Sequence, residues 1–247
     1  MKRLLVVPAA GRGTRLGWDG PKVLCPVGGR PMIEHLLDRY EPVVDHVVVV
    51  VAPQAQDDVS RVLARRAVPA ECVVQPEPTG MLPAILCALP PVEARAPRHV
   101  WVTWCDQIGI GQDTVSRLAT ATESDPEAAM TFPTVRQEPP YIHFSRDRTG
   151  RIVDVRQRRD GDDMPPAGES DAGLFALRLD TFRDALPRYA REAPVATTGE
   201  RNFLPFIPWL AARARVTTFP LTDARQAVGV NTLEDLRSME TYLRGAD

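Results

Sequence analysis

The 247-residue sequence has little of what marks several broad protein classes. Its four cysteines are scattered, with no C-x-x-C pair and no histidine cluster beside them, so neither a zinc site nor a disulfide framework is expected. The 30 basic and 32 acidic residues nearly cancel, which removes the electrostatic reason to expect a nucleic-acid partner. No apolar run reaches the roughly 18 residues of a membrane span, and the apolar stretch after Met1 is too short for a signal peptide. These absences predict a soluble, cytoplasmic protein without a nucleic-acid or membrane partner.

Lysine is the scarcest charged residue. The chain has 28 arginines but only two lysines, Lys2 and Lys22. Lys2 lies at the N-terminus, so Lys22 is the single interior lysine in a chain that otherwise uses arginine. A site that requires a compact ammonium group, and not the planar fork of a guanidinium, explains this choice better than chance retention.

The first half of the chain alternates strand-like and helix-like patterns. Short apolar or β-branched runs predict strands at residues 4–8, 46–52, 71–75 and 100–104, and helical spacing predicts helices from Pro31, over 59–67 and over 82–89. This alternation predicts an α/β protein with a Rossmann-like, mostly parallel sheet flanked by helices. Ligands of such sheets bind beyond the carboxyl ends of the strands, so the chemistry is expected just after Pro8, Gln75 and Trp104.

The second half is less regular. Helices are predicted at 181–191, 203–213 and 233–244, with a strand at 215–219. Between 135 and 168 the chain is rich in Arg, Asp, Pro and Gly, with two short strand candidates at 141–145 and 151–156. We interpret this stretch as a small β-rich insert that covers the substrate site; a plain surface excursion is the alternative. Residues 1–247 are expected to form one domain, with a nucleotide-binding half at about 1–132 and an acceptor-binding half at about 133–247.

The most informative motif is the run Pro8-Ala9-Ala10-Gly11-Arg12-Gly13-Thr14-Arg15, followed by Pro21-Lys22. A loop of glycine and alanine after an apolar strand lets backbone N–H groups approach a phosphate chain or a base closely. Arg15 and Lys22 add cations that can neutralise phosphate oxygens. The run is no Walker loop, because no G-K-[ST] closes it, and it lacks the third glycine of the dinucleotide fingerprint. We therefore predict a phosphate-binding loop.

This pattern, A-A-G-R-G-T-R with P-K after it, resembles the signature of the sugar-1-phosphate nucleotidylyltransferases, within the MobA-like NTP transferase superfamily. The likeness is strongest to the uridyltransferase domain of the N-acetylglucosamine-1-phosphate enzymes. Gln75 and Gly80 are similar to that family's base-reading pair, and Asp106 to its metal-binding aspartate. Asn231, in G-V-N-T, is similar to the asparagine that completes the metal site, so the motifs span residues 8 to 231.

The resemblance implies a nucleotide-diphospho-sugar transferase fold and a reaction that joins a nucleoside triphosphate to a sugar 1-phosphate and releases pyrophosphate. It implies Arg15 and Lys22 as catalytic residues, and Asp106 and Asn231 as Mg²⁺ ligands whose hard oxygens suit this ion. It further implies nucleotide contacts from Ala9, Ala10, Gly11, Gly13, Gln75 and Gly80, and acceptor contacts from Tyr141, Gln157, Arg159, Asp171 and Gly173. These two small molecules are the expected partners, and a homo-oligomer is compatible with the sequence.

The chain departs from the family pattern on the base and sugar side, while the phosphate and metal positions match. Met81 stands where the uridyltransferases usually carry threonine, Cys105 where they carry glycine, and Ile142 where a glycine follows the tyrosine. Gln157 lies near their acetamido-sugar glutamate, and Asp171-Ala172-Gly173 only loosely matches their N-T-G. A cytidylyl- or guanylyltransferase acting on a non-sugar phosphate or phosphonate is therefore an alternative, and so is a non-catalytic regulatory subunit that binds a nucleotide sugar. Asp106 and Asn231 also have a structural alternative, as helix caps.

Overall fold

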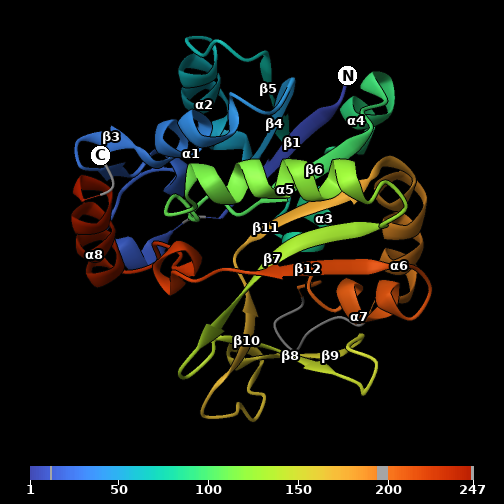
Figure 1. Cartoon of the computed structure of the whole chain (residues 1–247). Helices are drawn as coiled ribbons and strands as arrows, with labels where there is room; N and C mark the ends of the chain where they lie inside the picture. The colour runs from blue at the N-terminus through green and yellow to red at the C-terminus, as the bar shows by residue number, and fades with distance from the viewer. Residues whose placement is uncertain (12, 194–199, 246–247) are drawn as a thin grey trace.

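An eight-stranded sheet forms the centre of the computed structural model, which describes residues 1–11, 13–193 and 200–245. Along this sheet the strands follow the order β10-β7-β11-β6-β1-β4-β5, and β12 pairs with β7 (Figure 1). The strands are β1 (Arg3–Pro8), β4 (His46–Val51), β5 (Ala70–Val74), β6 (His99–Thr103), β7 (Met130–Gln137), β10 (Gly168–Asp171), β11 (Leu174–Arg178) and β12 (Val216–Pro220).

The pairing around β1 creates the place where a ligand is expected. β1 runs parallel to β4 on one side and to β6 on the other, and β5 continues the parallel half. β11 pairs antiparallel with β6 and β7, so the sheet is mixed but mostly parallel, which confirms the predicted fold class. Because the chain order reverses between β1 and β6, their carboxyl ends flank a topological switch point, where ligands of α/β sheets bind.

Side chains of the central strands alternate between two hydrophobic clusters, one on each face. In β1, Leu5 and Val7 belong to one cluster, and Leu4 and Val6 to the other. Helices cover both clusters, because a strand buried on two faces needs apolar partners on each. The first cluster includes residues of α1 (Met32–Tyr40), α2 (Gln56–Leu63), α5 (Gln112–Ser124) and α8 (Leu233–Arg244). The second includes residues of α3 (Met81–Leu86), α4 (Leu89–Arg95), α6 (Leu186–Glu192) and α7 (Phe206–Ala211).

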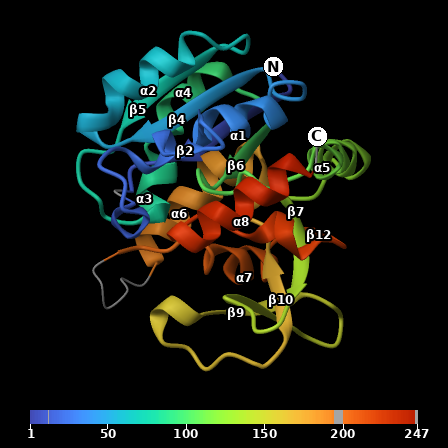
Figure 2. The same ribbon diagram turned by 90° about the vertical axis from the view of Figure 1, so that its left-hand side faces the viewer.

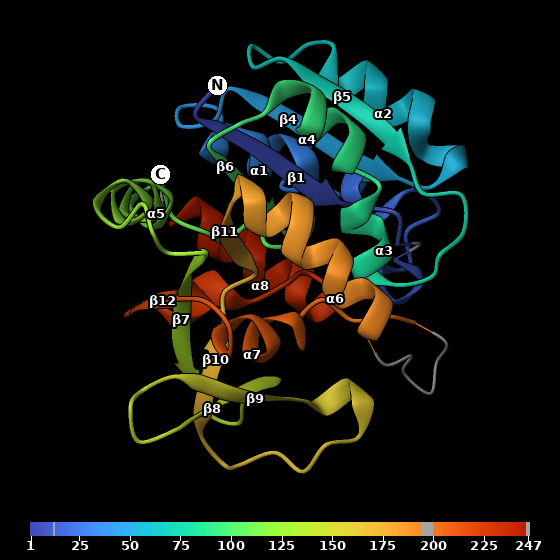
Figure 3. The ribbon, with the colours of Figure 1, turned by 90° about the vertical axis from the view of Figure 1, so that its right-hand side faces the viewer.

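The figures show these layers directly. In Figure 3, α5 and α6 lie on opposite sides of β11. Figure 2 shows α8 facing the viewer, and Figure 1 places it at the opposite side of the molecule from α7. No helix within the described residues is long and apolar enough to cross a bilayer.

The insert is a hairpin of β8 (Ile142–Arg146) and β9 (Ile152–Gln157), which confirms the two predicted strands. A short turn, η4 (Arg158–Asp160), follows β9. The hairpin lies at the far end of the molecule, below β10 and α7 in Figure 1. Arg146 connects the hairpin to the main sheet through a bidentate ion pair with Glu169 and a hydrogen bond to Thr218.

Several elements differ from the sequence-based expectations. β7, β10, β11 and α5 are absent from the expected elements, and the expected boundary between the two halves at 132/133 falls inside β7. A small hairpin, β2 (Pro26–Val27) with β3 (Arg30–Pro31), precedes α1 and is also unexpected. The expected helix at 233–244 is α8, with the same bounds.

Candidate active site

The glycine-rich loop after β1 is shaped by two residues in the left-handed region. Gly13 (φ +62°) and Gly17 (φ +63°) flank a short 3-10 helix, η1 (Thr14–Leu16). A Cβ on Gly13 would lie 2.8 Å from Lys22 Cβ, closer than side-chain carbons approach one another, whereas a Cβ on Gly17 would meet nothing within 4 Å. Gly13 therefore makes room for Lys22, which begins the next turn, η2 (Lys22–Leu24).

Lys22 joins three loops that are distant in the sequence. Its Nζ donates to Asp106 Oδ2, in the loop after β6, and to Asn231 Oδ1 at 2.8 Å. Arg15 Nη2 donates to the same Asn231 oxygen at 3.3 Å. The side chains of Lys22 and Asp106 are only 10% and 16% exposed, so this ion pair is shielded from bulk water. The loops after β1 and β6 thus meet across the switch point of the sheet.

Neither Asp106 nor Asn231 is a helix cap, so that alternative is wrong for both. The N-cap of α8 is Thr232, which forms a capping box with Asp235, and the N-cap of α5 is Gly111. Asp235 Oδ2 instead accepts the backbone N–H of Asn231 at 2.9 Å and so fixes the end of the loop that leads into α8. The capping leaves the Asn231 side chain directed at Lys22.

Gly229 brings the Asn231 loop against Asp106. A Cβ at this glycine would lie 3.3 Å from Asp106 Oδ1 and 3.2 Å from Asn231 Nδ2. Val230 N donates to Asp106 O at 3.1 Å, which adds a backbone link between the two loops. Asn231 Nδ2 donates to Gly229 O at 3.3 Å, and this contact turns the amide oxygen toward the two cations.

The oxygen pair fits a hard divalent cation. One carboxylate and one amide oxygen are ligands that Mg²⁺ accepts, together with phosphate oxygens and water. The Lys22 ammonium already lies between these two oxygens as a stand-in cation. Within the described residues no group of three or more His, Cys, Asp or Glu side chains is placed to hold a metal ion.

The expected nucleotide-binding residues lie along the carboxyl ends of β1 and β5. Ala9 N donates to Val50 O at 2.7 Å, which continues the β1 ladder into the loop, with Ala10 and Gly11 next to it. Gln75 is 5% exposed, and its Nε2 donates to Gly80 O at 3.3 Å, so the expected base-reading pair is in contact. Gly80 has φ +114°, and a Cβ on it would lie 2.6 Å from Arg201 N. Glycine is therefore required at position 80 by packing alone.

Asp171 and Gly173, two of the expected acceptor residues, form a buried corner between β10 and β11. Asp171 accepts the Gly173 N–H at 2.8 Å and a hydrogen bond from the Trp104 side chain. Burial nevertheless raises the pKa of Asp171 to about 6, because the loss of water around the charged form outweighs these hydrogen bonds. A Cβ on Gly173, where φ is +70°, would lie 2.6 Å from Trp104 Cδ1 and 2.5 Å from Gln107 Cγ.

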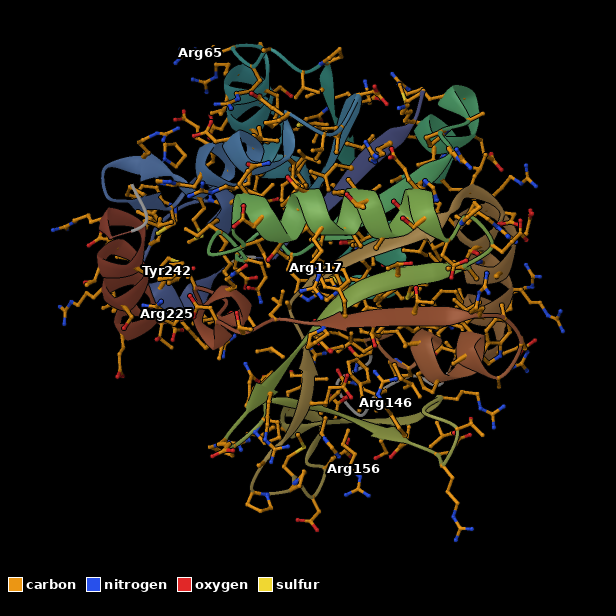
Figure 4. All side chains as sticks on the ribbon, viewed as in Figure 1. Arg65, Arg117, Arg146, Arg156, Arg225 and Tyr242 are labelled. Atoms are coloured by element: carbon orange, nitrogen blue, oxygen red, sulfur yellow. The ribbon has the colours of Figure 1, made fainter. Side chains whose placement is uncertain are left out.

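The other three expected acceptor residues belong to the hairpin. Tyr141 is 50% exposed at its entrance, and Gln157 is buried at the end of β9. Arg159 Nη2 donates to Glu200 and to Asn202 at 2.8 Å each, so its guanidinium is engaged by protein. Within the described residues, the hydrogen bonds of Tyr141, Gln157 and Arg159 do not reach Asp171 or Gly173. Arg156 projects outward from the hairpin in Figure 4, where it pairs with Asp154 of β9 and donates to the backbone oxygen of Asp163.

Comparison with known proteins decides the family. Residues 5–165 match the family model of the MobA-like NTP transferase domain. The chain belongs to this family. The bifunctional protein GlmU of Kineococcus radiotolerans is 30% identical over 237 residues, which cover 95% of this chain and 48% of that protein. The GlmU of Sorangium cellulosum is 26% identical over 247 residues, 97% of this chain and 51% of that protein. The chain therefore spans about half the length of these relatives, and it is a nucleotidyltransferase domain.

Within this nucleotidyltransferase domain, three of the departures noted above lie in the hydrophobic core or against it. Cys105 and Ile142 are 9% and 8% exposed core residues, and Met81 packs against the α3 side of the core. Burial, together with the neighbouring Asp106 charge, raises the pKa of the Cys105 thiol to about 12. Cys105 is thus a neutral packing residue beside the Asp106 loop.

Two groups of residues around the site were not predicted. Asp235 and Gly229 position Asn231. The T-x-x-D spacing of a capping box, with Thr232 as the cap, is the sequence signal that points to Asp235. Glu200 and Asn202 hold Arg159. No local pattern marks these two residues, because their role depends on tertiary contacts more than 40 positions away.

Proposed function

We propose that this nucleotidyltransferase domain joins a nucleoside triphosphate to a sugar 1-phosphate in a Mg²⁺-dependent reaction that yields an NDP-sugar and pyrophosphate. The observation that carries the proposal is the contact of Lys22 with both Asp106 and Asn231. It supports a single charged centre at the switch point, built from the phosphate-binding loop and from an oxygen pair suited to a divalent ion.

The chemistry explains why cations gather here. An oxygen of the acceptor phosphate attacks the α-phosphorus, a new P–O bond forms, and the bond to the β-phosphate breaks with release of pyrophosphate. Both reactants are polyanions, so catalysis depends on alignment and on neutralised charge more than on a general base. Lys22 would hold the α-phosphate or the attacking phosphate, and Arg15 would bind the triphosphate.

Asp106 and Asn231 would hold Mg²⁺, which supplies charge neutralisation and alignment of the phosphate oxygens. Between catalytic cycles the Lys22 ammonium would neutralise the Asp106 charge, so that a buried carboxylate is never left unpaired. Ala9, Ala10, Gly11, Gly13, Gln75 and Gly80 are the proposed nucleotide contacts.

On the acceptor side, Tyr141, Gln157, Asp171 and Gly173 are the proposed contacts, and the relatives named bifunctional protein GlmU support a sugar 1-phosphate. The departures from the uridyltransferase pattern at Met81, Ile142 and Gln157 favour a second candidate, a cytidylyl- or guanylyltransferase acting on a non-sugar phosphate or phosphonate.

A pyrophosphate-release assay tests both candidates. The protein is incubated with Mg²⁺, each NTP in turn, and a panel of hexose and N-acetylhexosamine 1-phosphates beside alcohol phosphates and phosphonates. We expect release with one NTP and a sugar 1-phosphate, and a loss of at least about 10²-fold in Asp106→Ala and Asp106→Asn with both variants still folded. Activity only with CTP or GTP and a non-sugar acceptor favours the second candidate. No release from any combination by folded protein contradicts both.

A further inference from the structure

Three consecutive residues, Glu200 to Asn202, connect the turn around Gly80 to the hairpin; we call them the bridge segment. On one side, Arg201 N donates to Thr79 O at 3.1 Å, and Leu82 N donates to Arg201 O at 3.1 Å. Gly80 leaves no room for a Cβ between them, so the turn and the bridge segment touch backbone to backbone. A shift of the Gly80 turn therefore moves Arg201 with it.

On the other side, the residues that flank Arg201 bind the hairpin. Arg159 Nη2 donates to Glu200 Oε2 and to Asn202 Oδ1, each at 2.8 Å. Asn202 Nδ2 in turn donates to Asp160 Oδ2 at 2.9 Å, and Arg159 Nε donates to Asp160 Oδ1 at 3.4 Å. Arg159, Asn202 and Asp160 close a ring of contacts that uses both ends of the Asn202 amide.

These contacts are poorly suited to stabilising the fold as a whole. The Arg159 and Glu200 side chains are 37% and 40% exposed, and ion pairs this exposed contribute little to global stability. What the ring does is define the position of one surface segment relative to another. It links η4 of the hairpin to a turn about 80 positions earlier, which carries the proposed base contact Gly80.

The opposite end of the hairpin has an independent attachment. Arg146 binds Glu169 with two hydrogen bonds and Thr218 with a third, at 2.7 to 2.9 Å. Figure 4 shows Arg146 between the hairpin and the main sheet. The hairpin is thus held to the sheet at one end, and to the Gly80 turn through the bridge segment at the other.

We propose that the bridge segment couples the binding of nucleotide and acceptor, with Arg159, Asp160 and Asn202 as positioning residues. The inference rests on the proposed function, because it takes the Gly80 turn as nucleotide-contacting and the hairpin as acceptor-contacting. An acceptor that fixes the position of the hairpin also fixes the position of the Gly80 turn. Each ligand therefore binds more tightly when the other is present. Arg159 then acts through Asn202 and Glu200 and not by touching the acceptor.

Calorimetry with a non-reacting pair measures this coupling. The probes are α,β-methylene-UTP and N-acetylglucosamine 1-phosphate with Mg²⁺, or the corresponding analogue of whichever pair releases most pyrophosphate. The nucleotide Kd is measured without acceptor and with saturating acceptor, and the ratio of the two is the coupling factor. We expect a ratio of at least about fivefold in the wild type, the lower end of usual couplings, and a ratio near one in Arg159→Gln and Asn202→Ala.

Arg146→Gln is the matched control, because it removes an arginine ion pair from the other end of the same hairpin; its ratio should stay at the wild-type value. A wild type that binds both ligands with a ratio of one overturns the coupling and leaves the proposed function intact. Arg159→Gln with weaker acceptor binding but an unchanged ratio also overturns it, since Arg159 is then a direct acceptor contact. If neither probe nor any active pair binds the wild type, both the coupling and the proposed function are contradicted.

Hydrogen exchange gives a second readout that needs no turnover. The Leu82 amide donates to Arg201 O, so its exchange rate reports on the attachment of the bridge segment. We expect saturating acceptor alone to slow exchange in the peptide containing Leu82 in the wild type and in Arg146→Gln, but not in Asn202→Ala. Equal protection in all three proteins contradicts the proposal.

Discussion

Alanine substitutions at Gly13 and at Gly17 distinguish two effects on turnover, the displacement of Lys22 and the backbone strain of the glycine-rich loop. The two glycines flank the same 3-10 turn and have almost the same φ, +62° and +63°. They differ in what a Cβ would touch: Lys22 Cβ at 2.8 Å and Lys22 Cγ at 3.0 Å for Gly13, and nothing within 4 Å for Gly17. Gly17→Ala is therefore a control for the backbone penalty of Gly13→Ala.

The expected magnitudes follow from these distances. A left-handed alanine costs about 1–2 kcal/mol, so each variant should melt roughly 2–8 °C below the wild type. Carbon atoms pack at about 3.5–4.0 Å, so Gly13→Ala also displaces the stem of Lys22 by about 1 Å. A misplacement of about 1 Å can lower turnover about 10²-fold, and Gly17→Ala should stay within about threefold of the wild type.

The assay is pyrophosphate release at saturating substrates, with melting temperature measured on the same preparations. Equal losses of turnover in the two variants would refute the reasoning, because the strain of the loop would then be the whole effect. Full turnover in Gly13→Ala would refute it as well, since Lys22 would tolerate the displacement.

Two further predictions concern Lys22 and Asp171. Lys22→Arg should lower turnover at least about tenfold with little change in melting temperature, because the planar guanidinium cannot lie between Asp106 and Asn231 as the ammonium does; wild-type turnover would mean that positive charge alone suffices. Burial raises the pKa of Asp171 from 3.8 to about 6, so this carboxyl costs no stability below about pH 4 and progressively more as pH rises to 6. Asp171→Asn should therefore gain up to about 3 kcal/mol over the wild type between pH 4 and pH 7.5. The free energy of unfolding of both proteins is measured by calorimetry at each pH. The difference between them cancels the opposite trend from His99, a residue whose pKa is lowered to about 4 by burial. A difference that does not depend on pH would contradict the prediction.

The parallel half of the fold follows from local sequence because its strands are dense apolar runs. In β4, the segment His46–Val51 is buried throughout, and its valines leave no other structure open at that length. The expected helix at 233–244 matches α8, which has Thr232 as its N-cap and Gly245 as its C-cap. Here local propensity and tertiary burial agree.

The missed elements are those in which tertiary packing overrides a weak local signal. β7 contains Pro133 and alternates apolar residues with threonine, yet it is buried over six of its eight positions because β11, β12 and β10 surround it. α5 is rich in threonine and serine, which are poor helix formers, and two of its five buried residues are threonines: Thr114, Val115, Leu118, Ala119 and Thr122. Neither pattern is strong enough without the neighbouring elements.

The site residues illustrate the same limit. Lys22, Asp106 and Asn231 are individually predicted from motifs, but their mutual contact depends on β6 lying next to β1, which periodicity does not determine. The engagement of Arg159 by Glu200 and Asn202 depends on how two surface loops meet, and no spacing rule encodes it.

Anomalous diffraction from a crystal grown with Mn²⁺ and a non-hydrolysable NTP tests the central claim most directly. Asp106 and Asn231 should both contribute an oxygen within about 2.4 Å of a single anomalous peak, with the triphosphate on its other side and the Lys22 ammonium moved onto a phosphate oxygen. A peak in another crevice, or nucleotide bound with Lys22 still between Asp106 and Asn231, would contradict the account.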